Sequence, residues 1–134
     1  MTPYPLKIVT PDGLIFDGEA EQLSVRTTGG EVGILAHHID YVAALGMGQA
    51  VIVTGGIRRT AACIGGILSV KSGEVTLVPT TFEWADQIDP DRAERSLERA
   101  QQELKRADAS EMELKLAEAR LKRALVRKSV HSGL

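Results

Sequence analysis

The sequence predicts an α+β protein in which an all-β domain, a sandwich or a barrel, precedes an antiparallel pair of helices. Up to residue 82 the chain is rich in Gly, Val, Ile and Thr, the residues of short strands and tight turns. After Arg99 no Gly occurs before Gly133, and Ala, Leu, Glu, Arg and Lys dominate. Asp89-Pro90 marks the change, because Asp caps helices and Pro suits the first helical position. We therefore expect a β domain over residues 1–85 and a helical arm over residues 86–134.

Short apolar runs separated by turn residues predict the strands. Pro11-Asp12-Gly13 closes the first run, Asp17-Gly18 reads as a hairpin turn, and Gly65-Gly66 interrupts a long apolar stretch. Pro79 is expected to end the last strand. The predicted strand segments are 6–10, 14–16, 23–26, 32–35, 50–53, 57–64, 67–70 and 75–78.

Two helices are predicted from the apolar spacing after Pro90. The first stripe contains Ala93, Leu97, Ala100, Leu104 and Ala107, and the second contains Leu114, Ala117, Leu121 and either Ala124 or Leu125. Ser110 and Glu113 fit a capping box for the second helix, and the short loop before it favours an antiparallel hairpin. Only four of these residues are leucines, so the hairpin is expected to be marginally stable alone and able to change its arrangement.

Composition excludes several classes of protein. Residues 1–87 hold nine acids and five bases, whereas residues 88–134 hold nine acids and eleven bases, so we expect no nucleic-acid partner. The single cysteine excludes an internal disulfide and favours a reducing compartment. We see no secretory signal and no apolar run long enough to span a membrane, so any membrane contact is expected to be indirect.

No catalytic constellation emerges from the residues. His37 and His38 are adjacent and point in opposite directions on an extended chain, so they read as loop residues and not as a metal site or general base. Cys63 lies in an apolar strand and reads as a small buried residue. An enzyme built on these three residues is the least favoured class.

The helical arm offers a candidate anion site. No acid follows Glu118, and in an antiparallel hairpin the start of the first helix lies beside the end of the second. Four arginines could then converge on one polyphosphate: Arg92, Arg99, Arg123 and Arg127. The alternatives are a solvated basic face, or ion pairs with Glu83, Asp86, Glu94 or Glu98.

Several motifs together resemble the epsilon subunit of bacterial F-type ATP synthase. They are Val9-Thr10-Pro11-Asp12-Gly13, Gly30-Glu-Val-Gly-Ile-Leu35 with His38 after it, Gly65-Gly66-Ile-Leu-Ser-Val70, Ile88-Asp89-x-x-Arg92-Ala93, and the run Leu121–Val130. The resemblance covers nearly the whole chain. It implies an N-terminal antiparallel β-sandwich followed by a C-terminal antiparallel two-helix hairpin.

The resemblance also implies a non-catalytic rotor subunit of the central stalk. The β domain would bind the gamma subunit and the ring of c subunits, coupling proton flow to ATP synthesis. The helical arm would extend into the catalytic head of alpha and beta subunits and inhibit ATP hydrolysis. The implied location is the cytoplasmic face of the bacterial cell membrane, held there by the complex. The alternative is an unrelated β scaffold with a partner-binding hairpin.

In some members of that family ATP binds the folded-down arm as a regulatory ligand, and no cofactor is required. Carried onto this chain, the resemblance implies that Arg92, Arg123 and Arg127 pair with phosphates and that Ile88 and Asp89 contact the nucleoside. Glu83 and Arg99 complete the expected set. The chain departs from the family pattern in the loop Leu35–Asp40, where two usual prolines are absent, which loosens the backbone restriction there.

Overall fold

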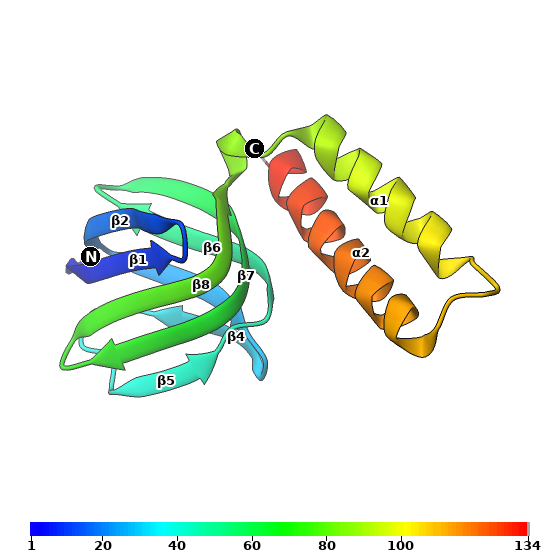
Figure 1. The fold of residues 1–134 in the computed structure, drawn as a ribbon. Coiled ribbons are helices and arrows are strands. Elements are labelled where there is room, and N and C mark those ends of the chain that lie inside the picture. Colours follow the sequence, from blue (N-terminus) through cyan, green and yellow to red (C-terminus); the bar gives the residue numbers. More distant parts are fainter. Residues whose placement is uncertain (134) are drawn as a thin grey trace. The chain divides into compact units, whose positions relative to one another are not determined.

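The computed structural model describes residues 1–133 and contains two compact units, Met1–Trp84 and a second unit that begins at Ala85. The first unit holds every strand, and the second holds the helices. No helix within residues 1–133 is long and apolar enough to cross a membrane. The predicted fold class, a β-sandwich followed by a two-helix hairpin, is confirmed in both parts (Figure 1).

The first unit is one eight-stranded sheet that folds over on itself (Figure 1). Its path runs β2-β1-β8-β7-β6-β3-β4, and β5 pairs with β7 beside that path. Neighbouring strands are antiparallel except β1 and β8, which are parallel. The strands are β1 (Tyr4–Thr10), β2 (Gly13–Ala20), β3 (Gln22–Thr27), β4 (Gly30–Ile34), β5 (Tyr41–Ala44), β6 (Met47–Thr54), β7 (Ile57–Lys71) and β8 (Glu74–Trp84).

Alternating side chains fill the space between the two layers. On β1 the inward residues Tyr4, Leu6 and Ile8 are buried while the intervening residues are not fully buried, as a half-buried strand requires. The Tyr4 hydroxyl donates to the carbonyl oxygen of Ile34 at 2.7 Å, and burial raises the pKa of Tyr4 to about 12. This bond ties β1 to β4 through the core.

The long strand β7 changes partner at Gly65-Gly66. Residues 57–64 of β7 pair with β6, and residues 67–70 pair with β5. Both glycines have positive φ, and the main chain crosses between partners through Gly65 N–H to Gly46 O at 3.0 Å and Leu45 N–H to Gly66 O at 2.9 Å. The predicted break is therefore a change of partner within one strand, and the four-residue strand β5 was not predicted.

One turn prediction and one strand-end prediction are wrong. Asp17-Gly18 lies inside β2 opposite Lys7 and Leu6, and Gly18 lacks the positive φ that a tight hairpin turn needs; Gly13, at φ 124°, takes that role. Pro79 does not end β8, which continues to Trp84. The parallel pairing of β8 with β1 ends at Leu77, so Pro79 pairs only with Gly66 of β7. No strand on the other side of β8 requires a hydrogen bond from the N–H that proline lacks.

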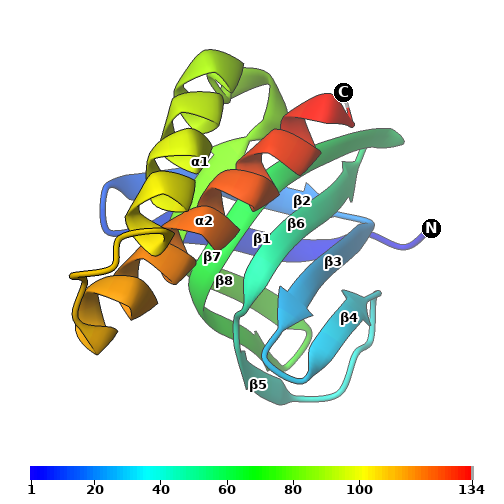
Figure 2. The same cartoon turned by 90° about the vertical axis from the view of Figure 1, so that its right-hand side faces the viewer.

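The second unit contains a short 3₁₀ turn, η1 (Ala85–Gln87), and two helices, α1 (Pro90–Leu104) and α2 (Glu111–Ser132). Asp89 caps α1 by accepting from Asp91 N–H at 3.0 Å and Arg92 N–H at 3.1 Å. Ser110 and Glu113 form the predicted capping box at the start of α2. The helices pack side by side and run antiparallel (Figure 2).

Small residues dominate the helix contact. Ala93, Leu97 and Ala100 of α1 are buried, as are three residues of α2: Ala117, Ala124 and Val130. The apolar stripe predicted for the first helix is one turn too long, because α1 ends at Leu104 and Ala107 lies exposed in the loop. On α2 the inward residue is Ala124, while Leu125 is exposed. Small side chains allow the two backbones to approach closely, which places their polar flanks near one another.

Candidate functional site

A groove of about 330 Å³ lies along the contact between α1 and α2. Its walls carry four arginines and only two other residues: Arg99, Arg120, Arg123, Arg127, Ser96 and Ala100. Within residues 1–133, no carboxylate lines the groove. A groove with this lining is suited to an anion with several negative charges, because guanidinium groups match phosphate and carboxylate oxygens in pairs.

Helical spacing gathers these arginines on one side of the hairpin. Arg120, Arg123 and Arg127 are three and four residues apart, so they lie on one face of α2. Ser96 and Arg99 have the same relation on α1. The buried alanines Ala100 and Ala124 set the close approach that brings the two faces together.

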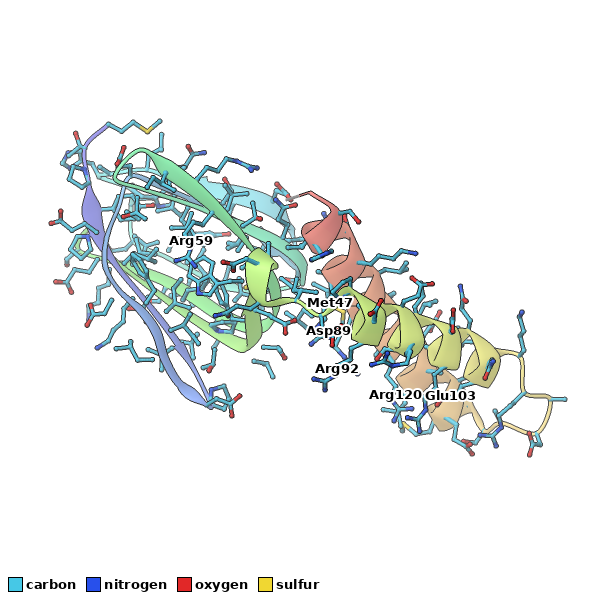
Figure 3. All side chains as sticks on the ribbon, turned by 90° about the horizontal axis from the view of Figure 1, so that it is seen from above. Met47, Arg59, Asp89, Arg92, Glu103 and Arg120 are labelled. Atoms are coloured by element: carbon cyan, nitrogen blue, oxygen red, sulfur yellow. The ribbon has the colours of Figure 1, made fainter. Side chains whose placement is uncertain are left out.

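One carboxylate reaches the arginines from the edge of the groove. Glu103 Oε2 lies 2.9 Å from Arg120 Nη1 of the facing helix, and Glu103 Oε1 lies 3.5 Å from Arg99 Nε on its own helix (Figure 3). Arg120 and Glu103 are joined by a hydrogen bond as well as by charge. Arg123 forms no ion pair within residues 1–133, so its positive charge in the groove is not neutralised by a carboxylate of this part of the chain.

Further ion pairs of the hairpin lie away from the groove. Lys128 Nζ lies 2.9 Å from Glu94 Oε2 between the start of α1 and the end of α2. At the other end Arg106 contacts both Asp108 and Glu113, and its hydrogen bond to Asp108 lowers the pKa of that carboxyl. Because these pairs are exposed to solvent, they orient side chains more than they stabilise the fold.

The structure brings together part of the predicted site. Arg99, Arg123 and Arg127 line the groove, whereas Arg92 does not and lies with Asp89 at the start of α1 (Figure 3). The Asp89 carboxylate caps α1, and the Ile88 side chain is buried. Glu83 belongs to the first unit, on β8 opposite Ala62.

Sequence reasoning missed Arg120, Ser96 and Glu103. The four predicted arginines do not include Arg120, although its spacing from Arg123 and Arg127 places it on their face. Glu103 carried no signal by itself, because its role depends on which residue of α2 lies opposite. Among the carboxylates that the sequence offered as ion-pair partners for the arginines, Glu94 pairs with Lys128 and not with an arginine of the groove.

Three other polar residues, His37, His38 and Asp40, lie on the loop before β5. His38 Nδ1 lies 2.7 Å from the carbonyl oxygen of Ile39, and the neighbouring His37 adopts a φ of 66° on the loop before β5. No group of three or more metal-ligating side chains occurs within residues 1–133. Asp40 accepts from Ser72 N–H at 2.9 Å, which fastens this loop to the β7–β8 turn. The loop presents Ile39, 78% exposed.

Cys63 provides a direct test of the core. Its side chain is 3% exposed and burial raises the pKa of the thiol to about 12, so the thiolate is scarce at neutral pH. We expect the native chain to react with the aromatic disulfide DTNB at pH 8 at least about a hundredfold more slowly than the chain in guanidinium. The chain has one cysteine, so the absorbance change reports this site alone. Equal rates in the two states would show that the strand opens freely.

Both units match one protein family over nearly their full length. Residues 4–85 match the beta-sandwich domain of the ATP synthase delta/epsilon chain, and residues 86–130 match its long alpha-helix domain. An ATP synthase epsilon chain from Ruminococcus albus is 44% identical over 131 residues, covering 97% of each chain. The chain belongs to the ATP synthase delta/epsilon chain family. A Bacillus cytotoxicus epsilon chain is 39% identical, again over 97% of both chains.

Solved ATP synthases contain the same fold. A chain in the cryo-EM structure of the Euglena gracilis mitochondrial ATP synthase superposes with a TM-score of 0.84 at 22% identity, over 96% of this chain and 81% of that one. A chain in the central stalk and c-ring structure from Tetrahymena thermophila gives 0.67 at 12% identity, over 95% of each. The resemblance to epsilon chains is thus confirmed, and an epsilon chain is a non-catalytic subunit of ATP synthase. Membership of this family excludes the unrelated scaffold and the enzyme built on His37, His38 or Cys63.

Proposed function

We propose that this chain is the central-stalk subunit that links the gamma subunit to the c ring of a proton-translocating ATP synthase. The observation that carries the proposal is the match of both units, in order, to the two domains of one ATP synthase subunit family. The two relatives are bacterial ATP synthase epsilon chains, and the match covers 97% of the length of each. The chain then lies at the cytoplasmic face of the cell membrane and is held there by the complex.

The β unit supplies the rotor contacts in this proposal. Loop 35–40 between β4 and β5 presents Leu35 and Ile39 as exposed apolar side chains beside His37 and His38. Apolar residues exposed together on one loop suit a protein partner. The Asp40 to Ser72 hydrogen bond restricts the loop where the two usual prolines are missing.

The hairpin supplies regulation. Its arginine groove carries a charge suited either to an acidic segment of a beta subunit in the catalytic head or to the phosphates of ATP. Binding of ATP to the closed hairpin stabilises that arrangement, and the hairpin extends and inhibits hydrolysis when ATP leaves. Arg99, Arg123 and Arg127 would contact phosphates, with Arg92, Ile88, Asp89 and Glu83 as the further residues of the expected site.

ATP hydrolysis by a catalytic head that lacks this subunit tests the proposal. We expect added chain to lower the rate saturably and to copurify with gamma. Copurification without a change in rate would leave a coupling subunit whose hairpin does not inhibit. Failure of both would contradict the proposed role.

A further inference from the structure

We propose that Glu103 is a positioning residue that competes, as an internal anion, with phosphate for the arginines of the hairpin groove. This inference rests on the proposal that the groove binds the phosphates of ATP. It makes Arg120, which lines the groove, a further ligand-binding residue, whose guanidinium group Glu103 engages when no ligand is bound.

The geometry gives Glu103 a distinct place among the carboxylates of the hairpin. It contacts two groove arginines from different helices, Arg120 at 2.9 Å and Arg99 at 3.5 Å. Its side chain is 24% exposed, whereas the other carboxylates in the ion pairs of the hairpin are 44% exposed or more. The side chains of Glu103 and Arg120 lie next to each other (Figure 3). Glu103 therefore occupies the position that a bound anion would take at this end.

Two effects follow from that position. Glu103 accepts from Arg120, so this guanidinium group has fewer N–H donors for a ligand. Its negative charge also repels an incoming phosphate at a short distance, where solvent and salt screen least. A polyphosphate carries several negative charges and can displace the single carboxylate of Glu103. Its net free energy of binding is nevertheless less favourable than in a groove without that carboxylate.

The hairpin offers a matched control in Glu94. Like Glu103 it lies on α1 and pairs at 2.9 Å with a basic residue of α2, in this case Lys128. The two glutamates are nine residues apart, about two and a half turns, so they lie on opposite sides of α1. Glu94→Gln therefore changes the net charge and breaks one interhelical pair, as Glu103→Gln does, without touching the groove.

Calorimetric titration of the full-length chain with inorganic tripolyphosphate, and separately with ATP, tests the inference. We expect Glu103→Gln to tighten binding of both ligands by about fivefold, the effect of removing one exposed charge interaction, and Glu94→Gln to change it by less than about twofold. Arg120→Ala should weaken tripolyphosphate binding more in the Glu103→Gln background than in the wild-type chain, because the wild-type Arg120 is already engaged.

Thermal unfolding without ligand separates this role from a structural one. Loss of one interhelical ion pair, with Arg120 in Glu103→Gln or with Lys128 in Glu94→Gln, should lower the melting temperature slightly in both variants, while binding tightens only in Glu103→Gln. A residue that merely supports the helices would lower stability and affinity together, so weaker or unchanged binding in Glu103→Gln would overturn the inference. Equal tightening in the two variants would also overturn it, because net charge would then explain the effect.

The result is separable from the fate of the wider proposal. Tripolyphosphate binding that Glu103→Gln leaves unchanged overturns only the role of Glu103. No binding of either ligand by wild-type chain and variant overturns both this inference and the proposed ATP site. The subunit role stands or fails on gamma copurification and ATP hydrolysis, which do not depend on Glu103.

Discussion

Replacing Arg123 and Arg127 together with Ala is expected to relieve inhibition of ATP hydrolysis. Both residues line the arginine groove on one face of α2, and both contribute to its positive charge. If that face binds an acidic segment of the catalytic head, loss of two charged contacts should raise the concentration for half-maximal inhibition by about tenfold or more. The measurement is the hydrolysis rate of a head lacking this subunit, titrated with wild-type chain and with the double variant.

The matched control replaces Lys115 and Lys122 with Ala. Both lysines are exposed on α2 and neither lines the groove. This control therefore removes two positive charges from the same helix, as the arginine variant does, but leaves the arginine face intact. We expect inhibition close to that of wild type. The titrations are run at low and high ATP, because the proposed binding of ATP to the closed hairpin should weaken inhibition by the wild-type chain and by this control, and not by the arginine variant. Equal relief by both double variants would assign inhibition to net charge instead of to Arg123 and Arg127.

Replacing Gly66 with Ala is expected to lower the free energy of unfolding of the β unit by about 4 kcal/mol or more. Gly66 has a φ of 101°, which side chains rarely adopt, and an added Cβ would lie 2.0 Å from the carbonyl oxygen of Val78 and 2.7 Å from Cα of Pro79. Neither neighbour is a flexible side-chain end, so β7 and β8 must separate where β7 changes partner. Guanidinium titration followed by Trp84 fluorescence measures the change, since Trp84 is the only tryptophan.

Gly55→Ala is the control for backbone strain alone. Gly55 also has a positive φ, 58°, but nothing lies within 4 Å of its added Cβ. Its cost is expected to be about 1–2 kcal/mol, the ordinary penalty for a side chain in the left-handed region. Similar losses in the two variants would mean that the close approach of Gly66 to Val78 and Pro79 is relieved by a small backbone shift.

Local chemistry in the sequence determined where each kind of structure begins. Asp89-Pro90 and the Ser110–Glu113 box define the starts of both helices, because caps act within one turn of the chain. The spacing of Arg123 and Arg127 likewise fixed a common face on α2 before any packing was known. The motifs along the chain were sufficient to point to the epsilon-chain family, which the full-length relatives confirm.

Tertiary structure alone decided which distant groups meet. The change of partner at Gly65-Gly66, the parallel pairing of β1 with β8 and the continuation of β8 through Pro79 all depend on strands far apart in sequence. The pairing of Glu103 with Arg120 depends on the register between two helices, which their small inward residues set. Local signals report backbone preferences over a few residues, whereas strand order and helix register follow from packing the whole core, and so no single segment encodes them.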